Sequence, residues 1–177
     1  MTIPSDYLAP HQTERLRMRP LGEEHTLPWV DFLRDERATR YFPDYIRLEA
    51  VTQAPEWIQR HHDRYATNRF GFLALHLPDG TFVGQCGLLL QEVDDEALLE
   101  IGYHLFPAHW GKGYATEAAM YFKEYASKYQ LSPFVVSLIH PENLPSQAVA
   151  KRNGMTPWKE STWQDLKVIV FRADLSE

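Results

Sequence analysis

The sequence has one cysteine, Cys86, among its 177 residues. A single cysteine excludes an internal disulfide and a multi-cysteine metal site. Such scarcity is typical of proteins in a reducing compartment, so we expect a cytoplasmic protein in which Cys86 is a small core residue. The chain has no run of roughly 18 apolar residues that would span a membrane, and "MTIPSDYLAPHQ" lacks the basic start and apolar core of a signal peptide. We therefore expect no membrane association.

The sequence also lacks an excess of positive charge: it has 18 Lys and Arg residues and 24 Asp and Glu residues, which gives a net charge of −6. Since a nucleic-acid-binding face needs clustered Lys and Arg, we expect no nucleic-acid partner. Adjacent His61 and His62 point about 100° apart on a helix, and no neighbouring ligand spacing completes a site. We predict no metal and place both histidines on the solvated surface.

The composition is that of an ordinary globular protein, with 44% hydrophobic and 24% charged residues. Residues 1–12 show no periodicity and predict a mobile N-terminal arm, whereas residues 13–177 are long enough for a single domain with a sizeable core. We find no internal repeat, linker or low-complexity segment.

The spacing of apolar residues changes along the chain between the period of a strand and that of a helix, which predicts an α/β protein. Alternation from Thr13 predicts a strand, helical spacing predicts helices over 26–36 and 52–68, and turn signals divide 70–106 into a three-stranded antiparallel meander. A helix follows Gly113. The remaining predicted elements are a buried strand over 134–139, a helix that Gly154 stops, and a strand over 168–172 that closes the sheet.

The stretch "HWGKGYATEA", residues 109–118, lies between a predicted strand and a predicted helix. A helix N-terminus offers free N–H groups and partial positive charge to a phosphate, and glycines let the ligand approach the backbone. Lys112 adds a full charge. The Walker and dinucleotide-binding patterns both fit this spacing poorly. The alternative is a tight turn that binds nothing.

Three segments together resemble the GNAT superfamily of acetyl-CoA-dependent N-acetyltransferases: "TERLRMRPL", "EIGYHLFPAHWGKGYATEA" and "NLPSQAVAKRNGM". The chain most resembles the branch that includes the ribosomal-protein N-terminal acetyltransferases, over nearly all of residues 13–173. One departure is Ala108, where the superfamily usually has Gln or Arg three residues before the first glycine. The resemblance implies a mixed, largely antiparallel central sheet with flanking helices.

The resemblance also implies where acetyl-CoA binds. The strand over 99–106 splays from the strand over 134–139, and the pantetheine arm lies in the gap. Asn143 contacts pantetheine, and the segment "TRYFPDY" forms a wall of the acceptor pocket, the alternative being a loop that only covers the core. The implied pyrophosphate-binding residues are Trp110, Gly111, Lys112, Gly113, Tyr114, Ala115 and Thr116; backbone amides of Tyr103, His104 and Leu105 bind the thioester; Tyr41, Phe42 and Asp44 line the acceptor pocket.

Glu100 is the candidate base that accepts a proton from the attacking amine. Alternation puts Glu100, Gly102 and His104 on one face of the strand. A carboxylate in the middle of an apolar strand costs free energy unless it is paired or has a function, such as that of a base. Glu100 can also bind the substrate amine, and the alternatives without function are a salt bridge or a carboxylate on the sheet surface. His104 lies about 13 Å along the strand, at 3.3 Å per residue, and is expected to serve packing. Ser146 matches the family's acid for the departing thiolate, or it is a helix cap.

The resulting hypothesis is acetyl transfer from acetyl-CoA to a primary amine, on a small molecule or a protein N-terminus. The alternatives are a non-catalytic coenzyme A-binding sensor or regulatory module, and a metabolite-binding domain. We expect a monomer or homodimer. The acidic balance, with Asp44 and Glu49 near Glu100, suggests cationic acceptors, although surface acidity alone also explains it.

Overall fold

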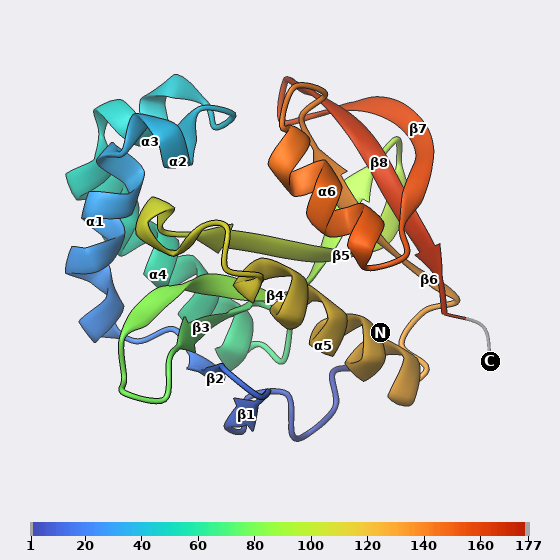
Figure 1. Cartoon of the computed structure of the whole chain (residues 1–177), viewed down its shortest axis with the longest axis horizontal. Coiled ribbons are helices and arrows are strands. Elements are labelled where there is room, and N and C mark those ends of the chain that lie inside the picture. Colours follow the sequence, from blue (N-terminus) through green and yellow to red (C-terminus); the bar gives the residue numbers. More distant parts are fainter. Residues whose placement is uncertain (1, 176–177) are drawn as a thin grey trace.

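The computed structural model describes residues 2–175 and contains one sheet in the order β1-β2-β3-β4-β5-β6-β8-β7 (Figure 1). Only β5 and β6 run parallel, and every other neighbouring pair is antiparallel. The predicted mixed, largely antiparallel sheet is therefore confirmed. The strands are β1 (His11–Gln12), β2 (Arg17–Pro20), β3 (Phe72–His76), β4 (Phe82–Val93), β5 (Glu96–Leu105), β6 (Phe134–Ile139), β7 (Thr156–Trp163) and β8 (Leu166–Asp174).

Helices cover both faces of this sheet, with α5 in front and α4 behind in the view of Figure 1. Side chains of β3 point alternately to the two faces: Leu73 and Leu75 join the core cluster of α5, whereas Phe72 and Ala74 pack with Ile58 of α4. The helices are α1 (Thr26–Arg34), α2 (Glu36–Thr39), α3 (Asp44–Leu48), α4 (Ala50–Ala66), α5 (Tyr114–Lys128) and α6 (Leu144–Arg152), with short 3-10 turns η1 (Glu23–His25) and η2 (Pro107–His109).

Strand β7 was not predicted from the sequence. It pairs with β8 at the edge of the sheet, so β8 does not close the sheet as expected. Its residues are mostly exposed, and the register shifts between Pro157 and Lys159. Because proline cannot donate a ladder hydrogen bond, a run that contains one is confined to an edge or a bulge.

The segment before Thr13 is packed against the domain, so the expectation of a mobile arm over residues 1–12 is wrong for the described part of it. Tyr7 is completely buried; its hydroxyl donates to the Gly71 carbonyl (2.7 Å) and accepts from the Leu88 N–H (2.9 Å). Asp6 accepts hydrogen bonds from the hydroxyls of Tyr125 and Tyr129 on α5. These contacts join residues far apart in the sequence and leave no periodic pattern in the segment itself.

The two adjacent histidines of α4 also differ from expectation. His61 is buried, stacks on Phe72, and its Nδ1 lies 2.9 Å from the Trp57 carbonyl oxygen. His62 is partly buried, with its Nε2 2.8 Å from the Leu21 carbonyl oxygen. His61 therefore packs α4 onto the sheet, and His62 joins α4 to the segment that follows β2, so the two rings do not lie on the solvated surface.

The anchoring of the N-terminal segment predicts a stability effect at Tyr7. Tyr7→Phe leaves the buried Gly71 carbonyl and Leu88 N–H without their partner, and we expect the free energy of unfolding to fall by about 1–3 kcal/mol in urea titrations. Tyr45→Phe is the control, because Tyr45 is 52% exposed. Equal stability of the Tyr7→Phe variant and the unaltered protein would contradict the anchoring role.

Candidate active site

The parallel strands β5 and β6 are paired at a single position, Glu100 opposite Val136. Close by, the Ser137 hydroxyl donates to the Ile101 carbonyl (2.7 Å). Toward their C-terminal ends, β5 stays paired with β4 up to Leu105, and β6 stays paired with β8 up to Ile139. The two strands therefore separate beyond Glu100, as the sequence analysis predicts.

The direction of the β5 backbone groups follows from alternation along the strand. The Ile101 carbonyl faces β6, whereas the Phe106 N–H donates to the Val83 carbonyl on the β4 side. Because backbone groups alternate between the two edges of a strand, Tyr103 and Leu105 face the gap. His104 faces β4, so its amide does not face the gap and the expected thioester contact is wrong for that residue.

The loop between β5 and α5 presents a row of backbone donors. Gly111 (φ 73°) and Gly113 (φ 83°) adopt the left-handed conformation that favours glycine, and Gly113 caps α5. No backbone N–H from Gly111 to Thr116 donates a hydrogen bond to any group in residues 2–175. This arrangement, at the positive end of a helix dipole, suits an anion.

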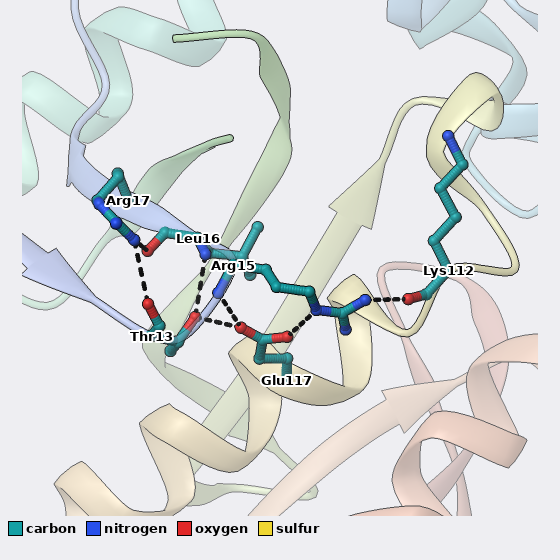
Figure 2. A network of polar contacts seen from close by, with 6 residues as sticks. All are labelled: Thr13, Arg15, Leu16, Arg17, Lys112 and Glu117. Atoms are coloured by element: carbon teal, nitrogen blue, oxygen red, sulfur yellow. Dashed lines mark hydrogen bonds and ion pairs between the residues drawn. The ribbon is translucent and has the colours of Figure 1, made fainter. Parts of the chain in front are cut away.

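Side chains beside the loop hold it in place. The Trp110 indole donates to the Leu105 carbonyl (2.8 Å), which ties the loop to the end of β5. Glu117, in the first turn of α5, accepts hydrogen bonds from Thr13 and Arg15 (Figure 2). Arg15 was not predicted as a site residue, because the "TER" segment carries a strand signal and nothing that points to a loop 97 residues away.

Glu100 carries a carboxyl group with a strongly perturbed pKa. Burial raises the pKa of Glu100 to about 7, against the opposing effects of a Gln91 hydrogen bond, the Leu138 backbone and the charge of Arg64. The Gln91 amide donates to Glu100 Oε2 at 2.8 Å. Within the described residues Glu100 forms no ion pair, so the salt-bridge alternative is not observed. A pKa near 7 suits a general base at neutral pH.

His104 lies on the same face of β5 as Glu100, and its side chain is neutral. Gln85 Nε2 donates to His104 Nδ1 (2.9 Å), and Gln85 Oε1 accepts from the Trp57 indole (3.1 Å). Burial lowers the pKa of His104 to about 4. The ring also meets Phe42 at a centroid distance of 5.1 Å. These contacts agree with the expected packing role.

The start of α6 separates the two interpretations of Ser146. Asn143 is the helix cap, and its Oδ1 accepts from the Ser146 N–H at 3.3 Å. Ser146 is the third residue of the helix, so the interpretation of Ser146 as the cap is wrong. Its hydroxyl makes no hydrogen bond within residues 2–175, while its carbonyl accepts from the Tyr103 hydroxyl (2.8 Å). This bond joins the end of β5 to the start of α6.

Two of the three predicted acceptor-pocket residues lie against the elements that carry the site. Tyr41 stacks on His140 with ring centroids 4.7 Å apart, and its hydroxyl donates to the Glu142 carbonyl (3.0 Å). Phe42 contacts His104. Asp44 is exposed, and neither it nor Glu49 is among the groups that shift the pKa of Glu100. The structure therefore gives no support to an acidic pocket beside Glu100.

Cys86 is fully buried in β4, and burial raises the pKa of its thiol, as expected of a core residue. Among residues 2–175, no group of three or more His, Cys, Asp or Glu side chains is placed to hold a metal ion. No helix in this part of the chain is long and apolar enough to cross a membrane.

The environment of Glu100 predicts pH-dependent stability. Since its folded pKa is about 7 and its ordinary value is 4.5, the native state binds this proton more tightly than the unfolded chain does. Stability is therefore lost as pH rises from 4.5 through 7. Glu100→Gln, which mimics the protonated group, should be more stable than the unaltered protein by about 1–3 kcal/mol at pH 8. The difference should shrink toward pH 5.

Urea unfolding at both pH values measures this difference. Glu96→Gln is the matched control, because Glu96 is an exposed carboxylate on the same strand. A constant stability difference between the Glu100→Gln variant and the unaltered protein at the two pH values would show that the Glu100 pKa is not raised.

Comparisons with known proteins agree with this geometry. A family model described as "Acetyltransferase (GNAT) domain" matches residues 15–156. The "Uncharacterized protein YkkB" of Bacillus subtilis (strain 168) is 30% identical over 146 residues, covering 81% of this chain and 83% of that protein. An acetyltransferase structure from Agrobacterium tumefaciens str. C58 is 28% identical with a TM-score of 0.76, covering 98% of this chain and 95% of the other.

Solved structures at lower sequence identity share the fold as well. RimL, a "Ribosomal L7/L12 alpha-N-protein acetyltransferase" solved in complex with coenzyme A, aligns with a TM-score of 0.70 at 16% identity. The alignment covers 92% of this chain and 95% of RimL. The family match over most of its length, together with the 30% identical relative, shows that the chain belongs to the GNAT acetyltransferase family.

Proposed function

We propose that the chain binds acetyl-CoA along the gap between β5 and β6 and transfers the acetyl group to a primary amine. The observation that carries this proposal is the row of unpartnered N–H groups from Gly111 to Thr116. A pyrophosphate offers the acceptors that such a row needs, and Lys112, exposed on the same loop, adds positive charge. The N–H groups of Tyr103 and Leu105 then meet the thioester carbonyl, and Asn143 meets pantetheine.

In the proposed reaction, the amine nitrogen attacks the thioester carbonyl carbon. Glu100 accepts the proton that the amine loses, directly or through a water molecule. The Tyr103 and Leu105 amides stabilise the negative charge that develops on the carbonyl oxygen. The carbon–sulfur bond breaks as the amide forms, and the departing thiolate takes a proton from the Ser146 hydroxyl. Ser146 then regains a proton from solvent, and Glu100 releases the proton it accepted to solvent.

The acceptor is a small-molecule amine or a protein N-terminus, bounded by Tyr41 and Phe42. The second candidate function, a coenzyme A-binding sensor or regulatory module without turnover, requires the same loop but no base. The raised pKa of Glu100 favours the enzyme, because removing a carboxyl partly from water without an ion pair in residues 2–175 costs free energy, and a base makes use of such a group. A monomer or homodimer in the cytoplasm remains our expectation.

Coenzyme A binding is tested at Gly113. Acetyl-CoA at 100 times its dissociation constant should stabilise the unaltered protein by about 2.7 kcal/mol. Gly113→Val should raise the dissociation constant by about 10-fold or more, because an added Cβ would lie 3.2 Å from Arg15 Nη2 and a φ of 83° is strained for valine. Isothermal titration calorimetry measures this change.

The control for this substitution is Gly80→Val. Gly80 has a φ of 92° and open space around it, so it carries the same backbone strain away from the loop. Unchanged affinity of Gly113→Val would place the ligand elsewhere. The absence of any stabilisation of the unaltered protein at millimolar acetyl-CoA would reject both the enzyme and the sensor.

Turnover is tested at Glu100 by thiol release from acetyl-CoA, with an acceptor found in a screen of amines and N-terminal peptides. Glu100→Gln should lower kcat by about 10²-fold or more while leaving coenzyme A affinity nearly unchanged. In the unaltered protein, kcat/KM should rise as pH passes through about 7, where the carboxyl loses its proton. Glu96→Gln should behave as the unaltered protein does, and equal activity of Glu100→Gln would remove Glu100 from the mechanism.

A further inference from the structure

Arg15 lies between β1 and β2 and reaches the loop that precedes α5 (Figure 2). Its Nη1 donates to the Lys112 carbonyl at 2.7 Å, and its Nε donates to Glu117 Oε2 at 2.7 Å. The Arg15 N–H donates to the other Glu117 oxygen at 2.8 Å. One side chain therefore joins the N-terminal part of the chain to both the loop and the first turn of α5.

The Lys112 carbonyl is the group through which Arg15 acts on the loop. It lies between Gly111 and Gly113, whose missing side chains allow the intervening peptide to rotate. Because a trans peptide is planar, its carbonyl and the following N–H point in opposite directions. When Arg15 holds the Lys112 carbonyl, the Gly113 N–H is turned away from Arg15 and left without a partner in residues 2–175.

Arg15 is itself held in this position. Its guanidinium lies over the ring of Tyr114, 4.8 Å from the centroid, and forms an ion pair with Glu117. Burial raises the pKa of Glu117, but hydrogen bonds from Thr13 and Arg15 outweigh it, so the carboxyl stays ionised at neutral pH. Charge-assisted hydrogen bonds of this kind are stronger than neutral ones and fix geometry.

We propose that Arg15 is a positioning residue: by holding the Lys112 carbonyl, it keeps the loop in the conformation that presents its N–H groups to the pyrophosphate of the acyl donor. This inference rests on the proposed function, because the loop is taken to bind coenzyme A. Arg15 then affects the binding of donors that contain a pyrophosphate and has no effect on donors that lack one.

The first test needs no ligand. Arg15→Met keeps most of the aliphatic stem but removes the donors, and Arg19→Met is the matched control on β2, since Arg19 pairs with exposed Glu24. In ligand-free protein, ¹⁵N relaxation should give lower order parameters for residues 111–113 in Arg15→Met than in Arg19→Met. Unchanged order parameters would overturn the positioning role even if affinity fell, because Arg15 would then contact the ligand directly.

The second test compares two donors. Arg15→Met should raise the dissociation constant for coenzyme A by about 10-fold or more. Its kcat/KM with S-acetylpantetheine, which lacks the pyrophosphate, should stay within about twofold of the unaltered protein. Urea unfolding confirms that the variant is folded.

The outcomes separate this proposal from the proposed function. Unchanged coenzyme A affinity in folded Arg15→Met, or an equal loss with both donors, overturns the role of Arg15 alone. Failure of the unaltered protein to bind coenzyme A would instead reject the proposed function, and the order parameters would still report whether Arg15 holds the loop.

Discussion

The site depends on one constraint of the sheet: its two parallel neighbours, β5 and β6, pair only at Glu100 and Val136. Each strand keeps a full antiparallel partner on its other side, so the sheet is held together while the two strands separate. The separation leaves the Tyr103 and Leu105 N–H groups facing a gap, and unpaired backbone groups at a strand edge are ready to bond an extended ligand. The Tyr103 hydroxyl still joins the two sides at Ser146.

The loop at the end of β5 extends this row of free backbone groups into α5. The first N–H groups of a helix have no partner within the helix, and here two left-handed glycines add the preceding residues to the same set. The chain thus offers N–H groups to an extended thioester along β5 and to an anion at the start of α5. Glu100 lies at the point of divergence, where burial raises its pKa.

The parts of this arrangement that depend on local pattern could be predicted from the sequence. Alternation assigned the two faces of β5, and the glycines of the 109–118 stretch marked the start of α5. Features that depend on long-range contacts could not be predicted. Arg15 and Glu117 are 102 residues apart, Tyr7 fills a site formed by distant strands, and β7 is exposed and contains a proline. The pKa of Glu100 depends on burial that alternation alone does not measure.

The central claim is that the unpartnered N–H groups of residues 111–116 receive the pyrophosphate of coenzyme A. Amide hydrogen exchange at these residues, measured by NMR with and without coenzyme A, tests it most directly. Exchange in the free protein should be fast, because these amides lack partners in the described structure. Saturating coenzyme A should slow exchange at several of these amides. Unchanged exchange at residues 111–116 in a protein saturated with coenzyme A would contradict the account.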